Sequence, residues 1–308
     1  IDDWQGRSVF VVGDADQSIY SFRAADFKIL MGFQADFGDG APDAVTATMV
    51  KLEENYRSTA TILEAANALI AHNSERIDKV LRPTRGEGEP IRLTRCDDEI
   101  AEAEAVVHGM RTLEAAHPDL RWGDMAVLYR TNAQSRVLEE SFIYAGMPYK
   151  VVGGTKFYDR KEVKDALAYL RVAANPLDEI NIKRVLNTPK RGIGESSIAK
   201  IDAYATESGI SFALALRNPA AAGVTGAAVK GIAAFNSLVD ACTGLLDQGP
   251  SVVLRHAMES SGYFAELAAE GTVESAGREE NLQELIGVAS EFTLVDEFLE
   301  QVALVADT

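Results

Sequence analysis

In the first half of the chain, apolar runs typical of strands alternate with segments that carry apolar residues at helical spacing. Val9–Val12 is a β-branched apolar run closed by a Gly-Asp pair, which is typical of a buried parallel strand that ends in a functional loop. Residues 62–70 instead carry apolar side chains at helical spacing, with Ser58 or Thr59 as the N-cap. Further strands are predicted at 49–53, 91–94, 126–129 and 149–152, and further helices at 98–116 and 135–145. Strands that alternate with helices indicate an α/β sandwich built on a parallel sheet.

The pattern changes after Gly153 and Gly154, where strand signals nearly vanish. Apolar residues recur at helical spacing within 163–170, 198–205, 282–289 and 295–302. The Ala- and Gly-rich stretch 219–234 predicts a loop that leads into another helix. The expected fold class is therefore α/β plus all-α, with a separate helical domain from about residue 153.

Composition narrows the classes of protein that fit. The chain has 308 residues, enough for roughly two domains. Its formal net charge of −17 argues against a protein that coats nucleic acid with a broadly basic surface, although a motor that touches phosphates along one groove stays compatible. The sequence has neither an apolar run of membrane-spanning length nor a signal peptide. Cys96 and Cys242 match no metal-ligand spacing, so we expect no metal site and two reduced, buried thiols in a cytoplasmic protein.

The strongest candidate site runs from Val12 to Arg23, directly after the first predicted strand. Polar loops at the end of a parallel strand are where α/β proteins place ligand chemistry. Gln17 can orient a water or contact a terminal phosphate, and Tyr20 and Phe22, with Arg23 beside them, can form a stacking platform for single-stranded bases. Taken alone, the spacing fits a turn followed by two core aromatics equally well.

A second candidate is Glu54–Ser58, at a predicted strand-to-helix turn. An arginine held rigidly at such a turn, here Arg57, can reach a phosphate and stabilise the charge that grows during phosphoryl transfer. By itself, an arginine before a helix is more often an ordinary surface residue.

Two further segments carry polar residues at turns before helices. Tyr129–Arg136 follows a predicted strand, and its side chains can touch DNA phosphates, while Ser135 can be a helix cap or a direct ligand. Asn187–Gly194 contains a Gly-Ile-Gly turn that can expose backbone N–H groups to a phosphate. Without other motifs, this last segment reads as an ordinary loop.

Together these segments, in this order, resemble superfamily 1 DNA helicases of the UvrD/Rep/PcrA family. The stretch 12–23 is similar to the third helicase motif, with Ala24 where members usually have Gly and Phe22 where they often have Trp. The resemblance implies that Gln17 senses the γ-phosphate of ATP and that Tyr20, Phe22 and Arg23 hold single-stranded DNA. The stretch 54–58 looks like the fourth motif.

In that fourth motif the resemblance implies that Arg57 contacts the γ-phosphate and that Tyr56 stacks on adenine. Tyr129–Arg136 resembles the family motif of the second motor domain, which makes Arg130 and Asn132 candidate DNA contacts. Residues 153–162 resemble the start of the accessory domain. The Gly-Ile-Gly segment then implies duplex contact, and its residues are Lys190, Arg191, Gly192, Ile193 and Gly194.

The resemblance also implies a domain plan. Residues 1–48 are expected to end a first RecA-like motor domain, 49–152 to begin a second, and 153–308 to form an inserted helical accessory domain. ATP with Mg²⁺ would lie between the motor domains, and the intact protein would travel 3′-to-5′ on single-stranded DNA, unwind duplex DNA and meet repair or replication proteins. No Gly-x-x-x-x-Gly-Lys-Ser/Thr phosphate loop occurs in the sequence, and no predicted strand ends in the Asp-Glu pair that would hold magnesium.

The chain opens at Ile1, just before a strand, and stops after a helical stretch, which favours an internal fragment of a longer helicase. Residues 1–308 alone are therefore expected to be inactive. Two alternatives remain open. One is a helicase subunit of the RecB/AddA type, and the other is a non-catalytic DNA-binding or protein-docking module.

Overall fold

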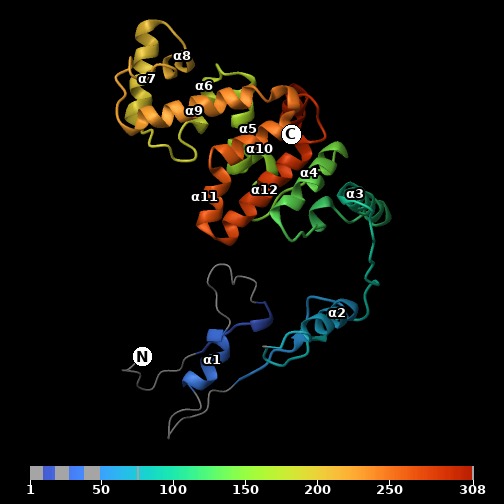
Figure 1. The fold of residues 1–308 in the computed structure, drawn as a ribbon. Helices are drawn as coiled ribbons and strands as arrows, with labels where there is room; N and C mark the ends of the chain where they lie inside the picture. Colours follow the sequence, from blue (N-terminus) through green and yellow to red (C-terminus); the bar gives the residue numbers. More distant parts are fainter. Residues whose placement is uncertain (1–9, 18–27, 38–48, 75, 307–308) are drawn as a thin grey trace. The chain divides into compact units, whose positions relative to one another are not determined.

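The computed structural model describes residues 10–17, 28–37, 49–74 and 76–306 (Figure 1). The chain divides into two compact units, Ile1–Arg95 and Cys96–Thr308. Within the described parts of the first unit, the elements are the 3₁₀ turn η1 (Ala15–Gln17), helix α1 (Lys28–Phe37), strand β1 (Glu54–Asn55), helix α2 (Ala60–Ile70) and strand β2 (Arg82–Pro83).

The sheet of the first unit is much smaller than the sequence predicts. β1 and β2 pair in parallel, with Glu54 opposite Arg82 and Asn55 opposite Pro83. Helix α2 lies beside this pair because the Asn67 amide donates to the Leu81 carbonyl (2.9 Å) and accepts from the Leu81 N–H (3.1 Å). The predicted helix at 62–70 is confirmed, with Thr59 as the N-cap residue.

The predicted strands at 49–53, 91–94, 126–129 and 149–152 are wrong, as is the described part of the run 9–12. Phe10 is 88% exposed, Leu93 97% and Leu128 89%. A strand is stable only beside a hydrogen-bonded neighbour, and in the described parts of the chain none of these runs pairs along its length. The run 49–53 reaches a neighbour at its last residue, where the Arg82 backbone N–H donates to the Glu53 carbonyl (2.7 Å). The RecA-like sheet therefore stays a prediction.

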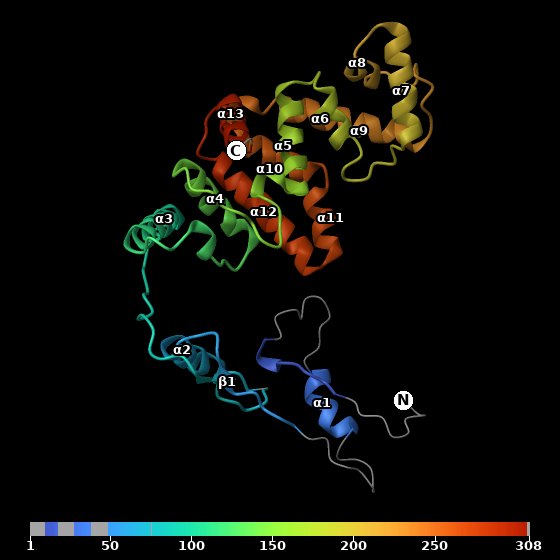
Figure 2. The ribbon, with the colours of Figure 1, turned by 180° about the vertical axis from the view of Figure 1, so that it is seen from behind.

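In the second unit, all of the described regular elements are α-helices or 3₁₀ turns, which loops connect (Figure 2). Its first part holds α3 (Glu99–Ala116), the turns η3 (Trp122–Asp124) and η4 (Asn132–Gln134), α4 (Ser135–Tyr144) and η5 (Phe157–Asp159). The remaining elements are α5 (Lys161–Ala174), α6 (Glu179–Val185), α7 (Glu195–Ser208), α8 (Phe212–Leu216), α9 (Ala227–Thr243), η6 (Leu246–Gln248), α10 (Pro250–Ser260), α11 (Tyr263–Glu270), α12 (Val273–Ala289) and α13 (Val295–Ala306).

Helix α5 is the centre of the hydrophobic core. It packs against α6, α9, α10 and α12, and nearly all of its side chains from Val163 to Ala173 are buried, which explains why its apolar pattern covers more than one face. Helices α7 and α8 lie together at one end of this unit (Figure 1). The predicted helices at 98–116, 135–145, 163–170, 198–205, 282–289 and 295–302, and the loop before α9, are all confirmed.

The two cysteines have different environments. Both are free thiols. Cys242 is buried in the core, and that burial raises the pKa of its thiol to about 11. Cys96 is only half-buried, which corrects the prediction of two buried thiols. Among the described helices, none combines the length and apolarity that crossing a membrane requires.

Candidate nucleotide and nucleic-acid interface

The turn that carries Gln17 is organised by Asp14. The Asp14 carboxylate accepts from the Gln17 side-chain amide (2.7 Å) and from the Asp16 backbone N–H (3.0 Å), and it also pairs with Lys79. Burial opposes ionisation of Asp14, but the hydrogen bonds from Lys79 and Gln17 outweigh it, so its pKa lies below the usual value. Gln17 is therefore an exposed side chain held by an ionised neighbour. Tyr20, Phe22 and Arg23 lie outside the described residues.

Ion pairs connect this turn to the segment that precedes β2. Asp16 pairs with Lys79 (3.3 Å) and with Arg76 (3.4 Å). These ion pairs link η1 to residues 76–79 inside the first unit, so the Gln17 turn and the β1–β2 pair share one compact structure.

The turn that carries Arg57 is built by Asn55. Its side-chain oxygen accepts from the backbone N–H groups of Arg57 and Ser58, both at 2.9 Å, which is the pattern of an Asx turn. Arg85 adds a hydrogen bond from its guanidinium to the Arg57 carbonyl (2.8 Å). The backbone at Arg57 is thus held on both sides while its side chain is exposed to solvent.

Tyr56 projects from the same turn and is 71% exposed. Its hydroxyl donates to Glu54 (2.6 Å), and this hydrogen bond raises the pKa of the tyrosine. An exposed ring beside an exposed guanidinium can hold a planar base and a phosphate on neighbouring positions. Gln17, Tyr56 and Arg57 all belong to the first unit.

The Tyr129–Arg136 segment exposes some of its predicted site residues and buries others. Arg130 and Asn132 are exposed, whereas Ser135 and Arg136 are buried. Ser135 is neither the helix cap nor an exposed ligand that the sequence suggested: its hydroxyl donates to Glu139 (2.7 Å) and accepts from Arg160 (2.8 Å). The sequence pattern singled out neither Arg160 nor Glu139, because their roles depend on residues far away in the chain.

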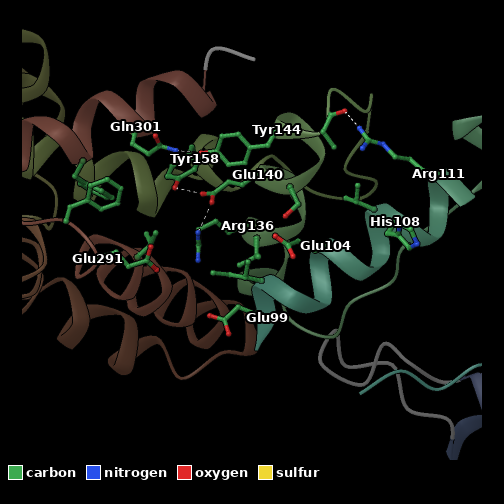
Figure 3. A pocket seen from close by; sticks show the side chains of 18 residues that line it. Glu99, Glu104, His108, Arg111, Arg136, Glu140, Tyr144, Tyr158, Glu291 and Gln301 are labelled. Carbon is green, nitrogen blue, oxygen red and sulfur yellow. Dashed lines mark hydrogen bonds and ion pairs between the residues drawn. The ribbon is translucent and has the colours of Figure 1, made fainter. Parts of the chain in front are cut away.

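Arg136 borders a cavity of about 580 Å³ between α3, α4, α12 and α13 (Figure 3). Its guanidinium donates to Glu140 (3.0 Å) and Glu284 (2.7 Å), and the Tyr158 hydroxyl also donates to Glu140 (2.9 Å). These charged groups satisfy one another, so Arg136 joins α4 to α12 instead of facing a ligand.

The Asn187–Gly194 loop is more internally bonded than the sequence suggests. The Arg191 guanidinium donates to the carbonyls of Val185 (3.0 Å) and Leu186 (3.2 Å) and to the Tyr169 hydroxyl (2.6 Å). Ile193 is buried in the core. Arg191 and Ile193 therefore hold the loop in place, and the exposed residues of the loop are Lys190, Gly192 and Gly194.

Asn187 sets the shape of this loop. Its side-chain oxygen accepts from the backbone N–H groups of Arg191 (2.7 Å) and Ile193 (3.2 Å), so these two amides are not available to a ligand. Gly192 has a φ of +73°, a left-handed conformation that favours glycine. On the other side, a Cβ at Gly231 of α9 would lie 2.2 Å from the Arg191 carbonyl oxygen, so glycine is required for α9 to approach the loop this closely.

Comparisons with known proteins show the family of the chain. Residues 4–38 match the UvrD/REP helicase N-terminal domain, and residues 50–219, more than half of the chain, match the UvrD-like helicase C-terminal domain. The chain is 39% identical over 308 residues to the ATP-dependent DNA helicase PcrA of Bacillus subtilis (strain 168), with 98% of this chain and 41% of that protein covered.

Other relatives agree. The ATP-dependent DNA helicase UvrD1 of Mycobacterium tuberculosis (strain ATCC 25618 / H37Rv) is 42% identical over 320 residues, which cover 96% of this chain and 40% of that protein. PcrA of Staphylococcus aureus (strain NCTC 8325 / PS 47) is 40% identical over 313 residues, with 98% and 41% covered. The chain thus spans about two fifths of the length of these relatives. On these matches, the chain belongs to the UvrD-like DNA helicase family.

Proposed function

We propose that the chain is part of an ATP-dependent DNA helicase that moves 3′-to-5′ along single-stranded DNA and unwinds duplex DNA during repair or replication in the cytoplasm. The observation that carries the proposal is the Asx turn at Asn55, which holds the Arg57 backbone rigid and leaves the guanidinium free to meet a phosphate. Arginines so presented stabilise the charge of phosphoryl transfer. The relatives' activity as ATP-dependent DNA helicases supports the assignment.

The proposed domains are successive segments of the chain. Residues 1–48 end a first RecA-like motor domain, 49–152 begin a second, and 153–308 form the helical accessory domain. ATP with Mg²⁺ binds between the motor domains, where Gln17 and Arg57 act on the γ-phosphate from opposite sides and Tyr56 stacks on adenine. The intact protein supplies the phosphate loop and the metal-binding carboxylates.

The proposed DNA contacts fall into two groups. Tyr20, Phe22 and Arg23 hold single-stranded bases, and the exposed side chains of Arg130 and Asn132 also contact single-stranded DNA. In the accessory domain, Lys190 with the backbone at Gly192 and Gly194 meets duplex phosphates. Arg191 and Ile193 serve this contact indirectly, since they hold the loop in place.

Polarity of unwinding tests the proposal directly. The full-length protein, supplied with ATP and Mg²⁺, is expected to separate a duplex that carries a 3′ single-stranded tail and to leave a duplex with a 5′ tail intact. A fluorescence strand-separation assay measures both rates. Hydrolysis of ATP without any response to single-stranded DNA would contradict the proposed function.

Gly194 offers a test of duplex contact that leaves the fold intact. Its φ of −87° and ψ of 166° accept a β-branched residue, and a Cβ there meets nothing within 4 Å. Gly194→Val is expected to block close approach of a phosphate and slow unwinding about ten-fold. Hydrolysis of ATP stimulated by single-stranded DNA is expected to persist, because it depends on the motor domains.

The double variant Gly192→Val with Gly194→Val is expected to unwind more slowly still. Because Gly192 has a positive φ, Gly209→Val at the end of α7 is the matched control: it carries a φ of +64°, with open space around it. The control is expected to lose stability without loss of unwinding. Normal duplex affinity and unwinding in the double variant would reduce the segment to a loop between two helices.

A further inference from the structure

Arg160 is a buried arginine between η5 and α5 that joins three separate segments. It is 7% exposed. One guanidinium nitrogen donates both to the backbone carbonyl of Asn132 (2.8 Å) and to the side chain of Asn281 in α12 (2.9 Å), and the other donates to the Ser135 hydroxyl (2.8 Å). A planar guanidinium can reach these acceptors at once, which the single ammonium of lysine cannot do.

The acceptors around Arg160 are themselves held in place. Asn281 is buried and uses its amide nitrogen to donate to Glu162 (2.7 Å), so its oxygen is left to face Arg160. Ser135 donates to Glu139, and that carboxylate also accepts from the Phe157 backbone N–H (3.3 Å). A buried polar network of this kind is rigid because every unmade hydrogen bond in it costs a desolvation penalty.

The loop at Asn132 is fixed on its other side by Gln134. The side-chain oxygen of Gln134 accepts from the backbone N–H groups of Arg130 (2.8 Å) and Thr131 (3.0 Å). Gln134 thus holds the backbone at Arg130 and Thr131, and the hydrogen bond from Arg160 holds the Asn132 carbonyl. Arg130 and Asn132 are both exposed to solvent on this turn, as is Gln134, whose side-chain oxygen is already engaged with the backbone.

We infer that Arg160 is a positioning residue that holds the Arg130–Asn132 turn in the shape that binds single-stranded DNA and, through Asn281, ties that turn to helix α12 of the accessory domain. The inference rests on the proposed function, since it assigns the exposed side chains to DNA. Arg160 touches neither DNA nor ATP in this scheme. It acts through the Asn132 carbonyl.

The test separates DNA dependence from turnover. In the full-length protein, Arg160→Gln is expected to raise the concentration of single-stranded oligonucleotide that half-saturates ATP hydrolysis by about ten-fold. The maximal rate and the KM for ATP are expected to stay within about two-fold, because the residues on the γ-phosphate are unchanged. Arg160→Lys, which keeps the charge and one hydrogen bond, is expected to give an intermediate value.

A matched control separates positioning from stability. Asp165, a buried carboxylate of α5, accepts from the Tyr263 hydroxyl (3.0 Å) and pairs with Arg184 (2.7 Å), with no contact to the Asn132 turn. Asp165→Asn is expected to lower the Tm while leaving the half-saturating DNA concentration unchanged. If Arg160→Gln fails to fold, Ser135→Ala replaces it in the test, because it removes a single acceptor of Arg160. This variant is expected to raise the half-saturating DNA concentration by a smaller factor.

The outcomes distinguish the two claims. If Arg130→Ala and Asn132→Ala weaken the response to DNA and neither Arg160→Gln nor Ser135→Ala does, the positioning role is wrong and the DNA contact stands. If Arg130→Ala and Asn132→Ala also leave the response unchanged, the turn is not a DNA contact and that part of the proposed function fails as well. A shift in Arg160→Gln that Asp165→Asn matches at equal loss of Tm would show a purely structural effect.

Discussion

Replacing Arg57 with alanine in the full-length protein is expected to slow ATP hydrolysis by about three orders of magnitude or more. The side chain stands on a backbone turn that two hydrogen bonds to Asn55 hold rigid, so the proposed contact with the γ-phosphate requires no reorganisation of the backbone. Binding of ATP is expected to weaken far less, since its other contacts remain. Steady-state hydrolysis and a nucleotide-binding titration measure the two effects separately.

Two further variants sharpen this prediction. Arg57→Lys is expected to recover only part of the rate, because an ammonium lacks the planar fork of a guanidinium. Arg92→Ala removes another exposed arginine of the same compact unit and is expected to hydrolyse ATP at the normal rate. A near-normal rate in Arg57→Ala would leave Arg57 an ordinary surface residue.

Residues 1–308 on their own are expected to show no DNA-stimulated ATP hydrolysis above background. Phosphoryl transfer requires a phosphate cradle and a bound metal, and the sequence has neither the Gly-rich loop with its lysine nor a predicted strand that ends in an Asp-Glu pair. A coupled ATPase assay with and without a single-stranded oligonucleotide measures this, with the full-length protein as positive control. Robust turnover by the 308 residues would overturn the domain assignment.

The helices could be predicted from the sequence and the strands could not, for a physical reason. A helix closes its hydrogen bonds within its own segment, so the spacing of Ile62, Leu69 and their neighbours is enough to reveal α2. A strand needs a partner. Leu93 and Leu128 lie in apolar runs that read as strands, yet neither run has a hydrogen-bonded neighbour in the described part of the chain.

In the candidate site, local turns could be predicted from the sequence, whereas roles that depend on tertiary contacts could not. Turn chemistry is local, so the Asn55 turn lies where the pattern of residues 54–58 places it. The inward orientation of Arg191 depends on Tyr169, which a different helix brings next to it. The role of Arg160 likewise depends on Asn281 in α12, and no local pattern connects two residues so far apart. Tertiary contacts thus decide which charged residues of a motif reach the surface.

The inward guanidinium of Arg191 also determines how the proposed duplex contact is expected to respond to ionic strength. An arginine that donates to backbone carbonyls and to Tyr169 displaces no cation from DNA, so Lys190 is the cation that this loop would bring to the duplex. Each phosphate neutralised by a side chain releases about 0.9 counterion from B-DNA. The loop is therefore expected to release roughly one counterion from DNA. The sequence alone would suggest two, because Lys190 and Arg191 are both cations. The proposed binding of this loop to DNA is therefore expected to depend less on salt and more on the shape of the loop.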